Sequence, residues 1–295
     1  MSLEGLTEDE SKVYDALLTE YSLYVKKLEA TKRKLAASIA DTPDRFAADF
    51  HTPEELLQMR LGRSADSIRG GMLESLADRL ARLNFGPVER VIVSGGADRD
   101  ECQKMKCPQS YVSGERKTVL WTRYSNESIV TEAAKLVQFI TEDRSHRIGT
   151  RLWAAKLEEA RARVRQAPRE KRPKKHIFDL YTADASVGYG EMKAGGNLDN
   201  TKARVEVTEM VKAALALDTG YERLRFFIAY ANNGEGKSIA GMLPEYFEPG
   251  HLLVGRQLWA QLLPDSVSVD RFEQLRAAAA AAARRQTNDA AQADS

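Results

Sequence analysis

The sequence has few cysteines and no long apolar run. Only two of its 295 residues are cysteines, Cys102 and Cys107, and no histidine lies near them. Two thiols alone cannot complete a four-ligand zinc site, so we expect two free thiols. No segment approaches the roughly 20 consecutive apolar residues that a helix needs to cross a bilayer. These absences exclude a structural zinc site built from cysteines and predict a protein that does not span a membrane.

A secretory leader and a histidine-based catalytic triad are also missing. The first residues, MSLEGLTEDESKVYDALL, are acidic and polar, without the basic and then apolar pattern of a signal peptide. We therefore expect a cytoplasmic protein. The histidines are scattered, and their spacing indicates no Ser-His-Asp arrangement. There are four of them: His51, His146, His176 and His251.

Hydrophobic periodicity divides the chain into three regions. Residues 1–86 are predicted to be mostly helical, with a helix start at Thr52 and Pro53 and a break at Gly70 and Gly71. Residues 87–270 alternate between strand-like and helical patterns, which predicts an α/β fold with a mixed central sheet covered by helices. The tail, residues 271–295, contains seven consecutive alanines that favour helix, and its last dozen residues are expected to be disordered. Helices are expected at about 7–40, 52–86, 126–165 and 200–217, and strands at 88–96, 117–122 and 223–234.

Three charged residues in HIFDLYTADASVGYGEMKAGG carry the candidate chemistry. Asp179 lies among four apolar neighbours in IFDLY, where an ionised carboxylate is costly to bury unless it meets a cation or hydrogen-bond donors. Glu191 and Lys193, in GEMKAG, are two residues apart. On a strand this spacing puts both side chains on one face and Met192 on the other.

The spacing of the two acids predicts a hairpin. Positions 179 and 191 are symmetric about position 185, and ADASVG at that point contains good turn residues. Asp179 and Glu191 would then be direct cross-strand neighbours, with Cβ atoms about 4.5 to 5.5 Å apart. Two carboxylates so close repel unless they share a cation, and oxygen ligands of this kind favour Mg²⁺. Asp184 is the rival for the first carboxylate, but the hairpin puts it in the turn.

Such a site predicts metal-assisted hydrolysis of a phosphodiester. The metal would stabilise the negative charge that grows during the reaction and supply the nucleophile, and Lys193 would orient or help deprotonate a water.

The pattern D-x11-E-x-K across two strands, followed by a helix, resembles the PD-(D/E)xK nucleases. EMKAGGNLDNTKAR and the following FFIAYANNGEGKSIAGMLPEYFEPGHLLVGRQLW look like the catalytic half of type II restriction endonucleases, and more narrowly the TdeIII-like group. The resemblance covers about residues 170–265 and not the helical first half. It implies Mg²⁺ held by Asp179 and Glu191, with Lys193 assisting the water. Phe178 departs from the family pattern because it stands where the family name has proline.

The resemblance also implies partners. These are double-stranded DNA as substrate, a second copy of the chain in a homodimer that cuts one strand per subunit, and a protecting DNA methyltransferase as genetic partner.

Basic residues around the motif are candidates for DNA contact. Between Lys156 and Lys175 nine residues are basic and three are acidic. Such a run is by itself typical of a solvated helix and a linker, but its position beside the motif favours contact with phosphates. After the motif, a loop and a helix start could bind backbone phosphate, or could form an ordinary capped, solvated helix start. The candidate DNA-binding residues are Lys174, Lys175, Lys202 and Arg204.

Three glutamates on predicted helices are candidates for further site residues, and one loop is a candidate for a different function. Nucleases of this class often add a helical glutamate to the site, but a solvated helix face is the simpler interpretation of each one here. The segment AYANNGEGKS resembles a relaxed phosphate loop, which would make the chain a nucleotide-binding protein. The same acids and basic run would also suit a repair or structure-selective nuclease, and the basic run alone would suit a DNA-binding protein without catalysis. The residues concerned are Glu132, Glu158 and Glu159 on helices, and Gly236, Lys237 and Ser238 in the loop.

Overall fold

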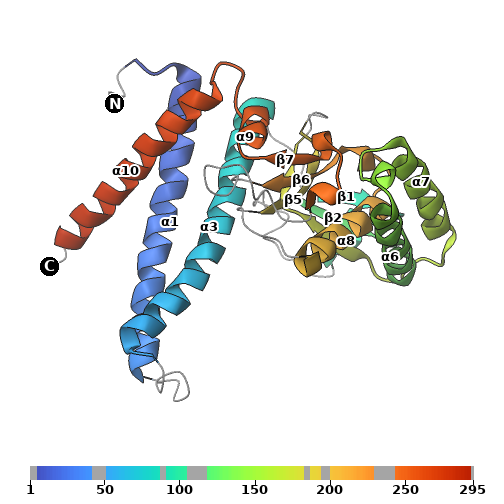
Figure 1. Ribbon diagram of the computed structural model, residues 1–295, viewed down its shortest axis with the longest axis horizontal. Helices are drawn as coiled ribbons and strands as arrows, with labels where there is room; N and C mark the ends of the chain where they lie inside the picture. The colour runs from blue at the N-terminus through green and yellow to red at the C-terminus, as the bar shows by residue number, and fades with distance from the viewer. Residues whose placement is uncertain are drawn as a thin grey trace. The chain divides into compact units, whose positions relative to one another are not determined.

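The structure is a computed structural model that divides into two compact units. We call residues 1–84 with 263–295 the helical unit, and residues 85–262 the sheet unit. Figure 1 shows the long helices of the first and the strands and shorter helices of the second. None of the helices in the described part of the chain is both long enough and apolar enough to cross a membrane. The described residues are 5–41, 51–86, 91–104, 118–182, 187–193, 200–228 and 243–293.

The helical unit contains three long helices. Helix α1 packs along α10, and an ion pair of 2.8 Å between Glu10 and Arg271 joins their ends. A second ion pair, of 2.5 Å, joins Glu20 of α1 to Arg79 of α3. The bounds are α1 Glu8–Asp41, α3 Pro53–Phe85 and α10 Val269–Ala293.

Reciprocal side-chain caps fix where α1 and α3 begin. Glu10 accepts a hydrogen bond from the amide of Thr7, whose hydroxyl accepts one from the amide of Glu10. Thr52 and Glu55 make the same pair of bonds before α3. This capping box satisfies amide groups that the first helical turn leaves unpaired. The predicted helix start at Thr52 and Pro53 is confirmed.

Two expectations for the helical unit are wrong. Helix α3 continues through Gly70 and Gly71 without a break. Each glycine costs about 1 kcal/mol relative to alanine in a helix, but the turns that follow bury Leu73, Leu76 and other apolar side chains, which offsets that cost. The tail is also helical to Ala293, so the disorder predicted for the last dozen residues is wrong for those that the structure describes, 284–293.

The sheet unit contains two small mixed sheets. The first has strand order β1-β2-β3, with β1 parallel to β2 and β3 antiparallel to β2. The second has the order β4-β5-β6-β7, with β4 antiparallel to β5 and the remaining pairs parallel. The strand bounds are β1 Val91–Ser94, β2 Thr118–Thr122, β3 Lys174–Phe178, β4 Leu180–Tyr181, β5 Tyr189–Lys193, β6 Leu224–Ile228 and β7 Leu252–Val254.

The single central sheet that the sequence predicts is therefore wrong, although the mixed α/β class is confirmed. The predicted strand through IFDLY is interrupted at Asp179, which lies in a bend. The residues before the bend form β3 in one sheet and those after it form β4 in the other. Asp179 thus lies where the chain passes from one sheet to the next.

Helices α6, α7 and α8 build the core over these strands (Figure 1). Ser125 and Thr150 cap α6 and α7, each accepting a hydrogen bond from an amide in the first turn. Helix α8 packs on α6 and contacts strands of both sheets, β2 and β5. It therefore lies beside the bend at Asp179. The helices of this unit are α4 Arg99–Lys104, α6 Asn126–Glu142, α7 Arg151–Gln166, α8 Asn200–Ala216 and α9 Arg256–Leu262, with 3-10 turns at Arg144–His146, Tyr221–Arg223, Leu243–Glu245 and Pro249–His251.

Candidate functional site

The hairpin that should bring the two acids together has the predicted register. Leu180 pairs with Gly190 and Tyr181 with Tyr189, so the pairs are symmetric about position 185. The amide of Thr182 donates to the carbonyl of Gly188 at 3.0 Å, which continues the same register toward the turn. The prediction that β4 and β5 are antiparallel with this register is confirmed.

Two glycines let β5 approach its other neighbour, β6. A Cβ atom at Gly188 would overlap the carbonyl oxygen of Arg223, and one at Gly190 would overlap that of Arg225. Gly188 also has φ of +73°, which residues with a side chain rarely adopt. The glycines around Tyr189 therefore hold β5 between β4 and β6, which leaves Glu191 and Lys193 on a strand with neighbours on both sides.

Asp179 is tied to β5 by its backbone and its side chain. Its amide donates to the carbonyl of Gly190 at 3.0 Å, and its Oδ2 accepts a hydrogen bond of 3.1 Å from the amide of Met192. The residue is only 4% exposed. Its carboxyl group is also within hydrogen-bonding reach of Glu191. The structure thus brings Asp179 close to Glu191, although Asp179 lies in the bend before β4 and not in the ladder of β4 and β5.

Burial and the charge of Asp179 raise the pKa of Glu191 to about 7, although Lys193 opposes this shift. Burial is the larger of the two causes, because an ionised carboxylate loses hydration inside the protein. A hydrogen bond between two carboxyl groups also needs a proton on one of them. The two carboxyl groups of Asp179 and Glu191 are therefore stabilised when they bind either a proton or a cation.

Lys193 joins the acids from the same face of β5. Its Nζ lies 2.5 Å from Oε1 of Glu191 and 3.1 Å from Oε1 of Glu206 on α8. Burial lowers the pKa of Lys193, but the two glutamates raise it more, so the net direction is upward. The lysine is held protonated between two carboxylates.

Glu206 is a site neighbour that the sequence pattern did not predict. It lies on α8, three residues after the buried Ala203 and four before the buried Met210. A glutamate beside the apolar stripe of an amphipathic helix is the signal that could have found it, because such a side chain points toward the core. Of the acids near Lys193, it is the one supplied by a helix.

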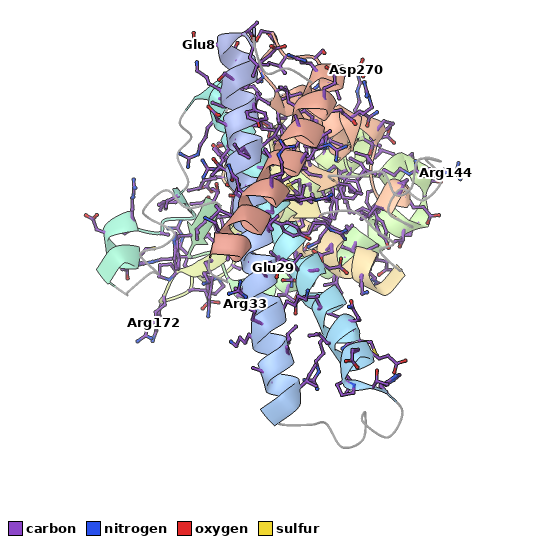
Figure 2. All side chains as sticks on the ribbon, turned by 90° about the vertical axis from the view of Figure 1, so that its left-hand side faces the viewer. Glu8, Glu29, Arg33, Arg144, Arg172 and Asp270 are labelled. Atoms are coloured by element: carbon purple, nitrogen blue, oxygen red, sulfur yellow. The ribbon has the colours of Figure 1, made fainter. Side chains whose placement is uncertain are left out.

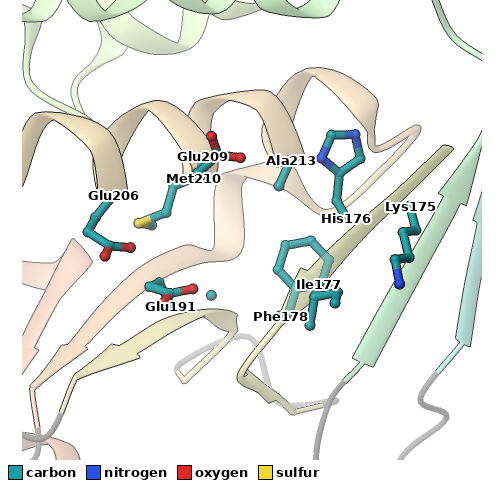
Figure 3. Close-up of a pocket in the computed structure, with 10 residues that line it drawn as sticks. Lys175, His176, Ile177, Phe178, Glu191, Glu206, Glu209, Met210 and Ala213 are labelled. Atoms are coloured by element: carbon teal, nitrogen blue, oxygen red, sulfur yellow. The ribbon is translucent and has the colours of Figure 1, made fainter. Parts of the chain in front are cut away.

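A pocket of about 320 Å³ opens beside these residues, between α8 and strand β3. Figure 3 shows Glu206 pointing from α8 toward Glu191, with His176 at the other end of the pocket beyond Phe178. Burial lowers the pKa of His176 to about 4, so its ring is neutral at pH 7. The acidic end of the pocket could admit a small cation and a water.

The donor set fits a hard divalent cation. Asp179, Glu191 and Glu206 offer three carboxyl groups around the single ammonium group of Lys193. Within the described residues, however, no three His, Cys, Asp or Glu side chains already stand together as a set of metal ligands. Mg²⁺ does not need such a set, because it keeps several waters and is commonly held by one or two carboxylates. Asp179 and Glu191 would be those two.

The helical glutamates named from the sequence lie elsewhere. Glu132 is 4% exposed and pairs with Arg163 at 2.7 Å and with Lys135 at 2.7 Å. The expectation of a solvated face is therefore wrong for Glu132, because α7 covers it. Glu158 pairs with Arg161 and is half-buried, whereas Glu159 is exposed and pairs with Lys156.

The basic run before the motif is partly used inside the fold. Arg161 is 1% exposed, stacks on Tyr221 and donates to the carbonyl oxygens of Leu217 and Asp218 at the end of α8. Such an arginine is structural and not a DNA contact. The candidate DNA-binding residues Lys174 and Lys175 on β3, and Lys202 and Arg204 in the first turns of α8, are all exposed.

Several sequence candidates lie outside the described residues. They are Cys107, the rival acid Asp184, and the phosphate-loop residues Gly236, Lys237 and Ser238. Cys102 is described and is buried.

Comparison of the chain with known protein families, with curated proteins and with solved structures finds no match.

Proposed function

We propose that this protein is a metal-dependent endonuclease of the PD-(D/E)xK type, and specifically a type II restriction enzyme that cuts double-stranded DNA. One observation carries the proposal. The β4-β5 register brings the buried acid Asp179 within hydrogen-bonding reach of Glu191, whose pKa is raised to about 7, and Lys193 lies 2.5 Å from Glu191. A buried acid next to a half-buried one is an unfavourable arrangement for stability alone, which favours a role in chemistry.

Each residue has a distinct role in this proposal. Asp179 and Glu191 hold Mg²⁺, which when bound stabilises negative charge on phosphate and lowers the pKa of a coordinated water. The ammonium group of Lys193 orients the attacking water and stabilises the charge that develops beside it. Glu206 holds Lys193 in place through their 3.1 Å ion pair.

The partners follow from the class of reaction. Exposed lysine and arginine side chains on β3 and α8 are suited to contact backbone phosphate near the site. A homodimer would cut both strands of a palindrome with one site per strand, and a methyltransferase would protect the host DNA.

Incubation of the purified full chain with plasmid DNA and Mg²⁺ tests the proposal. Discrete bands that disappear with EDTA are expected. A smear would instead mean a repair or structure-selective nuclease on the same site. Intact plasmid in the presence of Mg²⁺ would contradict both and leave a protein that binds DNA without cutting it, or does neither.

A matched pair of lysine variants sharpens the test. Lys193→Ala is expected to lower the cleavage rate at least about 100-fold, the usual range for loss of a preorganised group that stabilises charge in the transition state. Lys135→Ala removes a lysine that pairs with a buried glutamate elsewhere in the same unit. It is expected to cut at the normal rate. Undiminished cleavage by Lys193→Ala would remove that residue from the mechanism.

A further inference from the structure

Charge is segregated along helix α1 of the helical unit. Residues 8–20 contain five acidic residues and one lysine, whereas residues 26–34 contain five basic residues and one glutamate. Figure 2 shows the helix with Glu8 at its beginning and Glu29 and Arg33 in its second half. The net charge of +1 for the whole chain hides this separation.

The acidic half is used for internal contacts. Glu10 pairs with Arg271 of α10, and Glu20 pairs with Arg79 of α3. Asp9 accepts a hydrogen bond of 2.5 Å from Ser266. Two of the five acids in this half of α1 are therefore paired with arginines of other helices in the unit.

The basic half makes no such contacts with the part of the chain that the structure describes. Lys26, Lys27, Lys32, Arg33 and Lys34 are all exposed. Among the residues that the structure describes, none of these five side chains has an ion-pair or hydrogen-bond partner. A patch of one sign repels itself, so stability alone does not favour it.

Four of these residues share one face. Residues seven apart lie on the same side of a helix, so Lys26 stands above Arg33 and Lys27 above Lys34. We call these four residues the basic face. The half-buried Leu28 lies on the opposite side, and the one acid of residues 26–34 lies beside the basic face and not between its cations.

We propose that the basic face of α1 binds the phosphate backbone of duplex DNA. The choice of DNA as the partner rests on the proposed function, whereas the face itself is defined by the exposed cations of α1. Its two pairs of cations are separated along the helix axis by about 10 Å, seven residues at 1.5 Å each. That separation is close to the major-groove width of about 12 Å, so the pairs reach phosphates on both walls of the groove. Contacts of this kind position DNA without reading its sequence.

The test measures binding of a fluorescent 30-base-pair duplex to the full chain in EDTA, over a series of salt concentrations. The quadruple variant Lys26→Gln/Lys27→Gln/Arg33→Gln/Lys34→Gln removes the charges but keeps residues of similar helix propensity. It is expected to bind at least about tenfold more weakly at 0.1 M salt, with a shallower dependence of affinity on salt, because fewer counterions are released. The matched control Arg284→Gln/Arg285→Gln removes exposed arginines from α10 of the same unit and should bind like the original protein.

The outcomes separate this proposal from the proposed function. Normal duplex binding by the quadruple variant would overturn the proposal that the basic face binds DNA, even if the protein cuts plasmid. An equal loss in the control variant would also overturn it, because binding would then follow net charge and not the face. If the original protein binds phosphatidylserine vesicles and the quadruple variant does not, while both bind the duplex equally, the basic face would be assigned to a membrane surface instead. Failure of the original protein to cut plasmid would contradict the endonuclease but leave these binding results interpretable.

Discussion

The sheet unit contains two buried acidic neighbourhoods of opposite character. Glu132 is a single acid with two cations, Arg163 and Lys135, each 2.7 Å away. Burial raises the pKa of Glu132, but hydrogen bonds from these two cations lower it more. Asp179 and Glu191 are two neighbouring acids of which Glu191 pairs with Lys193, and burial together with the charge of Asp179 raises the pKa of Glu191 to about 7. The first neighbourhood is electrostatically complete, whereas the second has an excess of negative charge that a divalent cation would neutralise.

The largest expected difference is in catalysis. Glu191→Gln should lower the rate of Mg²⁺-dependent plasmid cleavage at least about 1000-fold, because a metal-binding carboxylate is lost. Glu132→Gln should change the rate by less than about threefold at a temperature where the variant is folded, since its charge is used within the α6-α7 pair. Single-turnover cleavage of one labelled duplex measures both. Comparable losses in the two variants would show that the two neighbourhoods do not differ in function.

The next difference is in stability, and it has the opposite order. Glu132→Gln should lower the free energy of unfolding by about 1 to 3 kcal/mol, because it leaves the two cations at a buried position without a carboxylate. We expect the lower part of that range, because water partly screens the exposed side chains of Arg163 and Lys135. Asp179→Asn should raise the free energy of unfolding of the metal-free protein by about 1 kcal/mol, because it removes the repulsion with Glu191.

Urea unfolding in EDTA measures both effects. The control Glu159→Gln alters an exposed pair and should change stability by less than about 0.5 kcal/mol. If the metal-free Asp179→Asn protein is less stable than the original, the two acids stabilise the fold. That result would contradict the interpretation that their repulsion is relieved by a bound cation.

The sequence is enough to predict that Asp179 and Glu191 approach each other, but not their surroundings. The register of β4 and β5 follows from a side-chain period of two and from the symmetric placement of Asp179 and Glu191 about a turn, and both are local properties. The burial of Glu132 is not local, because its partner Arg163 is on another helix, 31 residues later. The same limit hid Glu206, whose approach to Lys193 depends on how α8 packs against both sheets.

The strand interrupted at Asp179 and the helix α3 that continues through its glycines show the same difference between local sequence patterns and packing. The apolar pattern of IFDLY predicts a strand, but the bend at Asp179 depends on two sheets that meet there. The glycines in α3 predict a break by their intrinsic propensity, and tertiary burial of the neighbouring leucines outweighs it. Local patterns therefore predict elements and pairings, whereas packing between elements decides where they stop.

The two neighbourhoods should also respond to pH in opposite directions. Between its ordinary value of 4.5 and about 7, Glu191 holds a proton in the folded protein that the unfolded chain has released. Its contribution to the free energy of unfolding therefore falls as pH rises through this range, by about 1 to 3 kcal/mol in the metal-free protein. Glu132 has a lowered pKa, so its contribution is present above 4.5 and is lost as pH falls toward its folded value.

Urea unfolding of the metal-free protein at pH 5, 6, 7 and 8 measures the contribution of Glu191 by difference from Glu191→Gln. The free energy by which Glu191→Gln is more stable than the original protein should increase from pH 5 to pH 8. With saturating Mg²⁺ the original protein should instead be the more stable of the two. A gap that stays constant across this range would mean that Glu191 is not protonated in the metal-free fold.

The smallest expected effect is that of Glu206, which acts through Lys193. Glu206→Gln removes one of the two carboxylates that raise the pKa of Lys193. At pH 7 Lys193 stays protonated, so cleavage should fall by less than about tenfold. At high pH, however, the lysine should lose its proton sooner, and the alkaline limit of the pH-rate profile should move to lower pH. Glu206→Asp keeps the charge and should restore the limit in part. A profile that keeps its alkaline limit in Glu206→Gln while the protein only becomes less stable would make Glu206 a structural neighbour of α8, and the site would then depend on the hairpin residues alone.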